Sequence, residues 1–401
     1  MMTQRMKTWL TGLTLVTTLA ALGITAGALD RQAGDLVEAP RFEVDPMWPK
    51  PLPNGWVLGE TIGVGIDAKD HVWIVHRNDT LQPNEGAAGL TPPAGACCKA
   101  APPVLEFDTD GTLLHSWGGP GTGYEWPVSN HGIFIDYKGI VWIGGNGAPS
   151  AQTGGPGDGQ ILKFTQDGKF VAQFGKAVPG QVIASNDTPH FGRVAKIYVD
   201  PKANEAYIAD GYLNKRVAVI DADTGAFKRY WGAYGNKPDD TNLGAYDPTA
   251  PHAQQFRNPV HCSDLSVDNL VYVCDRPNDR LQVFTREGKF VTETYIATKT
   301  LGDGSIWDVA FSKDPEQKYL YIADGKNERI YVLLRKTLEM LTNFGDGGRQ
   351  PGQWFAVHSI ATDSKGNLYT TETYQGRRLQ KFVYKGIGKV PRTQGVVWPG
   401  K

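Results

Sequence analysis

The 401-residue chain is predicted to be an all-β protein, a six-bladed β-propeller, from three observations. Glycine is abundant, at 48 residues, and 11 Trp, 16 Tyr and 15 Phe accompany it, which favours turns and short strands over helices. One strand-turn-strand pattern recurs along the chain, as in repeat architectures. A second hairpin follows most copies, and two hairpins supply the four antiparallel strands of a propeller blade.

The first hairpin consists of an apolar strand, an aspartate, a short polar turn and a second strand that ends on Trp or Tyr. Its six copies are 63–75, 131–143, 196–210, 261–275, 308–324 and 358–372. Their aromatic residues are Trp73, Trp142, Tyr207, Tyr272, Tyr321 and Tyr369. These aromatic residues follow one another at intervals of roughly 50 to 70 positions. Six copies of one unit predict six blades.

The second hairpin has alternating apolar residues around an Asp-Gly or Glu-Gly type turn, a strong hairpin signal. It is visible at 160–175, 216–232, 280–294 and 329–345. The sixth copy has no full second hairpin after 378–386, so we expect the N-terminal segment 41–49 to supply the strand that closes the ring. An open sandwich or two domains are the alternatives, and repeats of equal size argue against both.

The N-terminus predicts export from the cytoplasm. Arg5 and Lys7 precede an apolar run that ends in Ala-Gly-Ala, which indicates a signal peptide at 1–28. An uncleaved membrane anchor is the alternative. A linker at 29–40, a propeller at 41–390 and a tail at 391–401 would follow in a secreted or periplasmic protein. The net charge of −1 gives no reason to expect nucleic acid or an anionic membrane as a partner.

Four cysteines fit an oxidising compartment. Cys262 and Cys274 lie symmetrically about Asp268, so they face each other across one hairpin at disulfide distance; buried thiols are the alternative. Cys97 and Cys98 are adjacent, and a vicinal disulfide, a soft-metal site and spare thiols all remain open for them.

Three histidines occupy one position in alternate copies of the repeat. His131, His261 and His358 each precede the aromatic residue of copies two, four and six by 11 positions. The first strand of each blade lines the central channel, and alternate blades lie about 120° apart, so the three imidazoles converge on the axis. This predicts a three-histidine metal site with an open position, as in catalytic zinc centres, although iron and copper also accept imidazole. The alternative is a hydrogen bond at each strand end.

The second strand of each hairpin ends beside this site, because the first strand starts there. Arg77 and Arg276 lie four positions after their aromatic residues, and Tyr212 follows the equivalent position of copy three. An arginine can hold a carboxylate with two hydrogen bonds, and a tyrosine near a cation and a metal can act as a base. Ion pairs of these arginines with Asp79 and Asp275 are the alternative.

The segments VHRND (75–79), IADGYLNKRV (208–217) and CDRPNDRLQVF (274–284) contain these three residues. They resemble the His-Arg-Gly-Asp, Ser-Asp-Gly-Tyr and Ala-Asp-Arg-Glu-Asn-Gly-Arg-Ile-Gln segments of the peptidyl-α-hydroxyglycine α-amidating lyases, zinc propellers of the NHL-repeat type. The wider NHL resemblance covers roughly residues 40–386. It implies that Arg77, Tyr212 and Arg276 are catalytic. It also implies that His131, His261 and His358 hold zinc.

Three departures from this family concern the surroundings of the site. Ser359 follows His358 where the family has an aspartate that helps to bind calcium, so the resemblance does not extend to calcium. Ala356 replaces a methionine two residues before that histidine. The insert 81–103 is particular to this chain, and it follows Arg77 closely enough to be expected as a lid over the channel.

The resemblance implies a metal-dependent carbon–nitrogen lyase that cleaves a carbinolamide bearing a carboxylate, a small molecule or a peptide, to an amide and glyoxylate. One alternative is a metal-dependent hydrolase of a lactone, ester or amide at the same site, because a bound metal can instead activate water. The other is a non-catalytic NHL propeller that binds a partner protein. We expect a monomer that has no membrane contact after signal cleavage.

Overall fold

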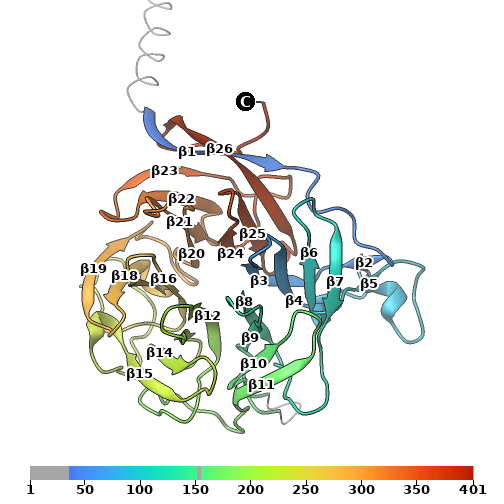
Figure 1. Ribbon diagram of the computed structural model, residues 1–401, viewed down its shortest axis with the longest axis horizontal. Helices are drawn as coiled ribbons and strands as arrows, with labels where there is room; N and C mark the ends of the chain where they lie inside the picture. Colours follow the sequence, from blue (N-terminus) through green and yellow to red (C-terminus); the bar gives the residue numbers. More distant parts are fainter. Residues whose placement is uncertain (1–35, 151–154, 401) are drawn as a thin grey trace, which may run out of the picture.

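The computed structural model describes residues 36–150 and 155–400, and the predicted signal peptide lies outside them. Antiparallel strands form six four-stranded sheets around a central axis (Figure 1). The predicted all-β, six-bladed propeller is therefore confirmed. No helix within these ranges is long and apolar enough to cross a bilayer.

The first three blades each run from an inner to an outer strand in chain order. Blade one contains β3 (Glu60–Ile66), β4 (Val72–Arg77), β6 (Val104–Phe107) and β7 (Leu113–Trp117). Blade two contains β8 (Asn130–Ile135), β9 (Val141–Gly145), β10 (Gln160–Phe164) and β11 (Phe170–Gly175). Blade three contains β12 (Val194–Asp200), β13 (Glu205–Asp210), β14 (Arg216–Asp221) and β15 (Phe227–Trp231).

The other three blades repeat this order, except that the last takes its outer strand from the N-terminal part of the chain. Blade four contains β16 (Val260–Leu265), β17 (Leu270–Asp275), β18 (Arg280–Thr285) and β19 (Phe290–Tyr295). Blade five contains β20 (Asp308–Phe311), β21 (Tyr319–Asp324), β22 (Arg329–Leu334) and β23 (Met340–Phe344). Blade six contains β24 (Val357–Thr362), β25 (Leu368–Glu372), β26 (Leu379–Pro391) and β1 (Leu36–Asp45).

Strand β1 closes the ring by pairing with β26, as the missing last hairpin predicted. The strand begins at Leu36, so residues 36–40, expected as linker, belong to it instead. The physical reason is that β26 is long enough to pair with all of them, with Leu36 opposite Pro391. The C-terminal residues continue along the outer edge of blade five, where Asn343 donates its backbone N–H to the carbonyl of Arg392.

The core lies between the blades. The inner strands β3, β8, β12, β16, β20 and β24 contact one another in sequence, and β24 contacts β3, which closes the inner ring. Buried apolar clusters fill the joints between neighbouring blades. The six repeat aromatics are at most 2% exposed. Some anchor their hairpin turn as well, since the Trp142 indole N–H donates to Asp136 at 2.8 Å.

The insert 81–103 does not cover the channel. It extends outward from blade one, where β5 (Lys99–Ala100) pairs in parallel with β2 (Trp56–Val57) (Figure 1). This pairing holds the insert at the rim of the ring, which corrects the expectation of a lid. The insert also carries the disulfide between Cys97 and Cys98.

Four short 3₁₀ turns complete the structure: η1 (Asn78–Thr80), η2 (Ala87–Gly89), η3 (Ala233–Gly235) and η4 (Arg276–Asn278). The predicted disulfide joins Cys262 to Cys274 across the hairpin of blade four, with their Cα atoms 4.8 Å apart. It links the residue after His261 to a residue just before Arg276. The disulfide therefore ties together two strand ends that carry predicted site residues.

Candidate metal and catalytic site

The three predicted histidines lie at one structural position, at the start of an inner strand. Each is the second residue of its strand: His131 in β8, His261 in β16 and His358 in β24. The pairing register with the neighbouring strand shifts at each of these points. Such a β-bulge changes the direction of a side chain. Here the structure brings all three imidazoles together at the axis.

The imidazoles form a compact, buried triangle. The ring centroids of His131 and His261 are 5.2 Å apart, and each lies 4.8 Å from that of His358. One nitrogen from each ring lies within 4.8 Å of the other two. The residues are only 2–3% exposed. Three nitrogens this close together can be ligands of one metal ion.

Each histidine is oriented by the blade that follows it. The Nδ1 atoms of His131, His261 and His358 lie 2.7, 2.5 and 2.6 Å from the backbone oxygens of Ala195, Trp307 and Ile62. A carbonyl only accepts, so Nδ1 must carry the proton in each ring and Nε2 keeps its lone pair. Hydrogen bonding of the second ring nitrogen to a carbonyl is typical of histidines that bind metals.

Burial also keeps these rings neutral. It is the main cause that holds the pKa of each histidine well below its ordinary value. The positive charges of Arg77 and Arg276 add to this effect for His131 and His358. Neutral imidazole is the form that binds a metal.

The hydroxyl of Tyr212 lies between two of the free nitrogens. Its oxygen is 2.9 Å from Nε2 of His131 and 3.0 Å from Nε2 of His261. A hydroxyl has one proton, so it can donate to only one of these two acceptors. Both hydrogen bonds of His358 are made through Nδ1, to Ile62 and Ser359. The three Nε2 lone pairs therefore face a single hydroxyl proton. A bound cation would satisfy the lone pairs that this proton leaves free.

Arg77 lies at the end of β4, beside this triangle. It donates to Glu60 and to the side chain of Asn146, at 2.8 Å in each case, and to the backbone oxygen of Asn130 at 3.4 Å. Its carboxylate partner is thus Glu60 on the neighbouring strand, and not Asp79 as one alternative expected. The guanidinium is 16% exposed, so it is fixed in place but can be reached from the channel.

Arg276 directly follows β17 and contacts Tyr212. Its Nη1 atom is 3.5 Å from the tyrosine oxygen, and its guanidinium stacks 4.4 Å from the ring centroid of Trp307. Its ion pair is with Asp303, at 3.6 Å. The expected partner Asp275 binds Arg280 instead, because that residue begins the strand paired with β17.

The sequence reasoning missed Trp307 and Asp303. Trp307 is the blade-five equivalent of the histidines, since it lies three residues before Ala310, the partner of the repeat aromatic Tyr321. The turn 312–318 of this blade is longer than the turns of the even blades and hides the equivalence in the sequence. Asp303 lies between strands, where no repeat position could reveal it.

A different group lies next to the histidines along the axis. A small cavity is lined by His131, His261, Lys196 and Asp308. The ammonium of Lys196 lies 2.5 Å from Asp308 and 3.0 Å from Asp264. Burial raises the pKa of Asp264 to about 6, although Lys196 opposes the rise. Two carboxylates here share one ammonium.

Comparisons with known sequences give distant relatives, and no family model matches the chain. NHL repeat-containing protein 3 of Mus musculus is 27% identical over 315 residues, 74% of this chain and 71% of that protein. The probable peptidyl-alpha-hydroxyglycine alpha-amidating lyase pgal-1 of Caenorhabditis elegans is 26% identical over 259 residues, 62% of this chain and 63% of that protein. Peptidyl-glycine alpha-amidating monooxygenase B of Xenopus laevis is 25% identical over 247 residues, 59% of this chain but 24% of that protein.

The chain thus has NHL-repeat relatives at about 25% identity, and one of them is named as an amidating lyase. It spans less than two thirds of the length of the amidating proteins. Among solved structures, a Bacteroides thetaiotaomicron protein of unknown function has a TM-score of 0.50 at 13% identity, covering 87% of this chain and 77% of that one. An inactive virginiamycin B lyase from Staphylococcus aureus has a TM-score of 0.44 at 15% identity, covering 89% of each chain. The similarity to the Bacteroides protein supports the fold alone. The TM-score of the virginiamycin B lyase is too low to support any argument.

Proposed function

We propose that this propeller is a zinc-dependent lyase that cleaves the C–N bond of an α-hydroxyglycine-type carbinolamide, R-CO-NH-CH(OH)-COO⁻, to an amide and glyoxylate. One observation carries the proposal: Nε2 of His131 and His261 faces the hydroxyl of Tyr212 at 2.9 and 3.0 Å, with His358 completing the triangle. The relative named as an amidating lyase supports the same reaction.

His131, His261 and His358 would hold the ion through Nε2, and all three share the tautomer that this requires. A bound zinc ion lowers the pKa of a hydroxyl group attached to it, here that of the carbinolamide. An oxygen-preferring cation such as calcium suits three imidazoles poorly. On the axis next to them, Lys196 already pairs with both carboxylates, so we expect no calcium there either.

Tyr212 moves the proton. In its phenolate form it takes the proton of the substrate hydroxyl, and the oxygen left behind becomes the aldehyde oxygen of glyoxylate as the C–N bond breaks. The amide nitrogen leaves with the electron pair of that bond and takes the proton from Tyr212. Arg276, 3.5 Å from the tyrosine oxygen, stabilises the phenolate.

Arg77 binds the substrate carboxylate. Its planar guanidinium is held by Glu60 and Asn146, so it presents a fixed donor to an anion in the channel. Fixing the carboxylate on one side and the hydroxyl near Tyr212 aligns the C–N bond for cleavage. The glyoxylate anion formed would remain bound to Arg77 until it is released.

The proposed site of action is outside the cytoplasm. The signal peptide at 1–28 is the basis for this expectation, and the two disulfides agree with an oxidising compartment. A secreted or periplasmic enzyme of this kind would meet its substrate there. Expression of the full chain followed by N-terminal sequencing of the exported protein tests the cleavage site.

The reaction is tested by following glyoxylate release from N-benzoyl-α-hydroxyglycine with the purified mature protein. We expect activity that a chelator abolishes and that added zinc restores. Release of benzoate in place of benzamide would instead indicate the hydrolase. A zinc-free protein without activity would favour a binding propeller.

A further inference from the structure

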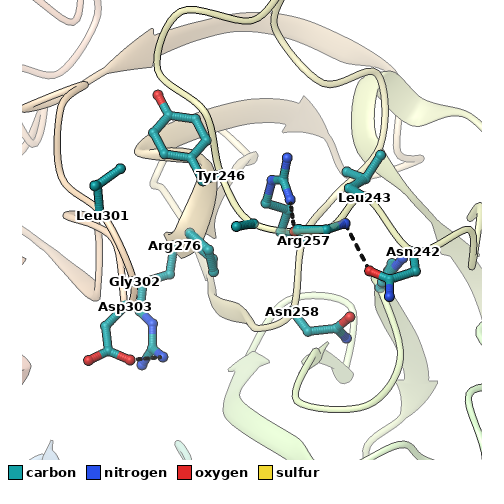
Figure 2. A pocket seen from close by; sticks show the side chains of 13 residues that line it. Asn242, Leu243, Tyr246, Arg257, Asn258, Arg276, Leu301, Gly302 and Asp303 are labelled. Atoms are coloured by element: carbon teal, nitrogen blue, oxygen red, sulfur yellow. Dashed lines mark hydrogen bonds and ion pairs between the residues drawn. The ribbon is translucent and has the colours of Figure 1, made fainter.

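A cavity of about 420 Å³ shares Arg276 with the candidate site. Two connections between blades form its walls: residues 242–246, between blades three and four, and residues 301–303, between blades four and five. Figure 2 shows Leu301 and Asp303 on one side, Asn242 and Leu243 on the other, and Arg257 and Arg276 between them. None of the histidines lines this cavity, so it is a separate space that reaches the site through Arg276.

The charges lining this cavity are mostly positive. Lys215, Arg257 and Arg276 line it, and Asp303 is the single acidic residue in the lining. Within the described residues, Asp303 pairs with Arg276, while Lys215 and Arg257 form no ion pair. Two cations are therefore left without a directly bound carboxylate at the wall of the cavity.

Both cations are held in place by neutral groups. The ammonium of Lys215 donates to the backbone oxygen of Thr241 at 2.6 Å. Arg257 donates to Asn278 at 2.6 Å and to the backbone oxygen of Gly244 at 2.5 Å. Burial lowers the pKa of Lys215 and of Arg257, although carboxylates beyond ion-pair distance, Asp239 and Asp240 for the lysine and Asp275 for the arginine, oppose it.

Arg276 adds an unsatisfied donor. Its side chain is 7% exposed, and its Nε atom is buried without a hydrogen-bond partner. Because that atom is shielded from solvent, a ligand group in the cavity can reach this guanidinium only through its terminal nitrogens, one of which pairs with Asp303. The apolar side chains of Leu243, Leu301 and Tyr246 offer contacts for methylene groups between that ligand group and the site.

We infer that this cavity binds an anionic group on the acyl part of the substrate, so that the preferred substrates are N-acyl-α-hydroxyglycines whose acyl chain carries a carboxylate. This inference rests on the proposed function and gives R in R-CO-NH-CH(OH)-COO⁻ a chemical class. A short dicarboxylate chain and an acidic amino-acid side chain share this chemistry. Arg77 then holds the carboxylate of the glycine part, while Arg257 and Lys215 hold the second one.

The test compares N-glutaryl-α-hydroxyglycine with the same compound bearing a carboxamide in place of the terminal carboxylate. We expect kcat/KM to be about 10- to 100-fold higher for the carboxylate, the range of a charge-assisted hydrogen bond.

Arg257→Gln and Lys215→Met are each expected to reduce this ratio roughly tenfold. Arg257→Lys keeps the positive charge, so this variant should retain part of the preference for the carboxylate compound. Lys389→Met removes an exposed charge on blade six and should leave the ratio unchanged.

A binding measurement separates this inference from the proposed reaction. N-glutarylglycine lacks the hydroxyl and cannot be cleaved, so calorimetry reports its affinity alone. Tighter binding of this compound than of its carboxamide, weakened at least tenfold by Arg257→Gln in a folded variant, supports the anion site even if no glyoxylate is released. Equal kcat/KM and equal affinity for the two chains in the unmodified protein would overturn the inference while leaving the lyase intact.

Discussion

At the start of the inner strand, the even and the odd blades use one equivalent position of the repeat differently. In blades two, four and six the residue at this point is a histidine, whose side chain faces the axis. In blades one and three the residues are Ile62 and Ala195, and in blade five it is Trp307; what these three contribute is a backbone oxygen. One position of the repeat thus provides the three proposed metal ligands and the three acceptors that orient them.

This difference predicts which substitutions the site tolerates. At the even positions the side chain is the proposed ligand, so we expect no substitution to be tolerated there. At the odd positions every residue that leaves the backbone path unchanged still presents its carbonyl. The predictions below separate the two roles, and the largest expected effect comes first.

The largest effect on activity is expected from Tyr212→Phe, in odd blade three. Removing the hydroxyl removes the proposed base, so kcat should fall by about 10²- to 10⁴-fold while KM changes little. Steady-state kinetics on N-benzoyl-α-hydroxyglycine measure both constants, and zinc content serves as the control for an intact histidine triangle. An unchanged kcat would remove Tyr212 from this role.

Lys196→Met tests the group of charges next to the histidines. Without its ammonium, Asp264 and Asp308 remain buried as unpaired carboxylates, and the free energy of unfolding should fall by about 3–5 kcal/mol. The pKa of Asp264 is already raised to about 6, so at acid pH this carboxyl is protonated and needs the ammonium less. The loss should therefore grow as pH rises through 6. Urea unfolding at pH 5 and pH 8 measures it, and an equal loss at both values would contradict this account.

Trp307→Phe separates side chain from backbone at an odd position. The carbonyl that orients His261 stays, so zinc content should not change. The stacking of Arg276 on the indole is weakened, and kcat/KM should fall by about 3- to 30-fold, the range of a cation–π contact. Metal analysis and kinetics on one preparation test both statements, and loss of zinc would show that the side chain has a part in orienting the ligand.

Ile62→Val is expected to have the smallest effect. The side chain is 1% exposed, so removing a methylene should cost about 0.5–1.5 kcal/mol of stability. The carbonyl that accepts the hydrogen bond of His358 remains, and zinc content and kcat should both stay at the unmodified level. A loss of metal here would contradict the division of roles between odd and even blades.

Much of this arrangement was accessible from the sequence because the even blades have hairpin turns of equal length. The constant spacing from histidine to aromatic residue follows from that equality. The positions of Arg77, Tyr212 and Arg276 follow instead from counting along one strand from the repeat aromatic to the strand end. The closing strand was predictable in kind, since the last blade lacks a hairpin. Its start at Leu36 depends on how far β26 extends, which pattern alone does not show.

The remainder of the site depends on contacts between segments that no repeat relates. Glu60 and Asn146 reach Arg77 from neighbouring strands, and Asp303 reaches Arg276 from a connection between blades. The cavity walls 242–246 and 301–303 are also such connections. Their positions are set by packing, so spacing in the sequence carries no signal for them.

Metal analysis of the mature protein beside His131→Ala, His261→Ala and His358→Ala variants tests the central claim most directly. The account predicts about one zinc ion per chain in the unmodified protein and none in any of the three variants, with thermal unfolding showing that each variant is folded. A folded, unmodified protein that binds no zinc even after incubation with the ion would contradict it. The histidines would then serve only to join neighbouring blades through their Nδ1 hydrogen bonds.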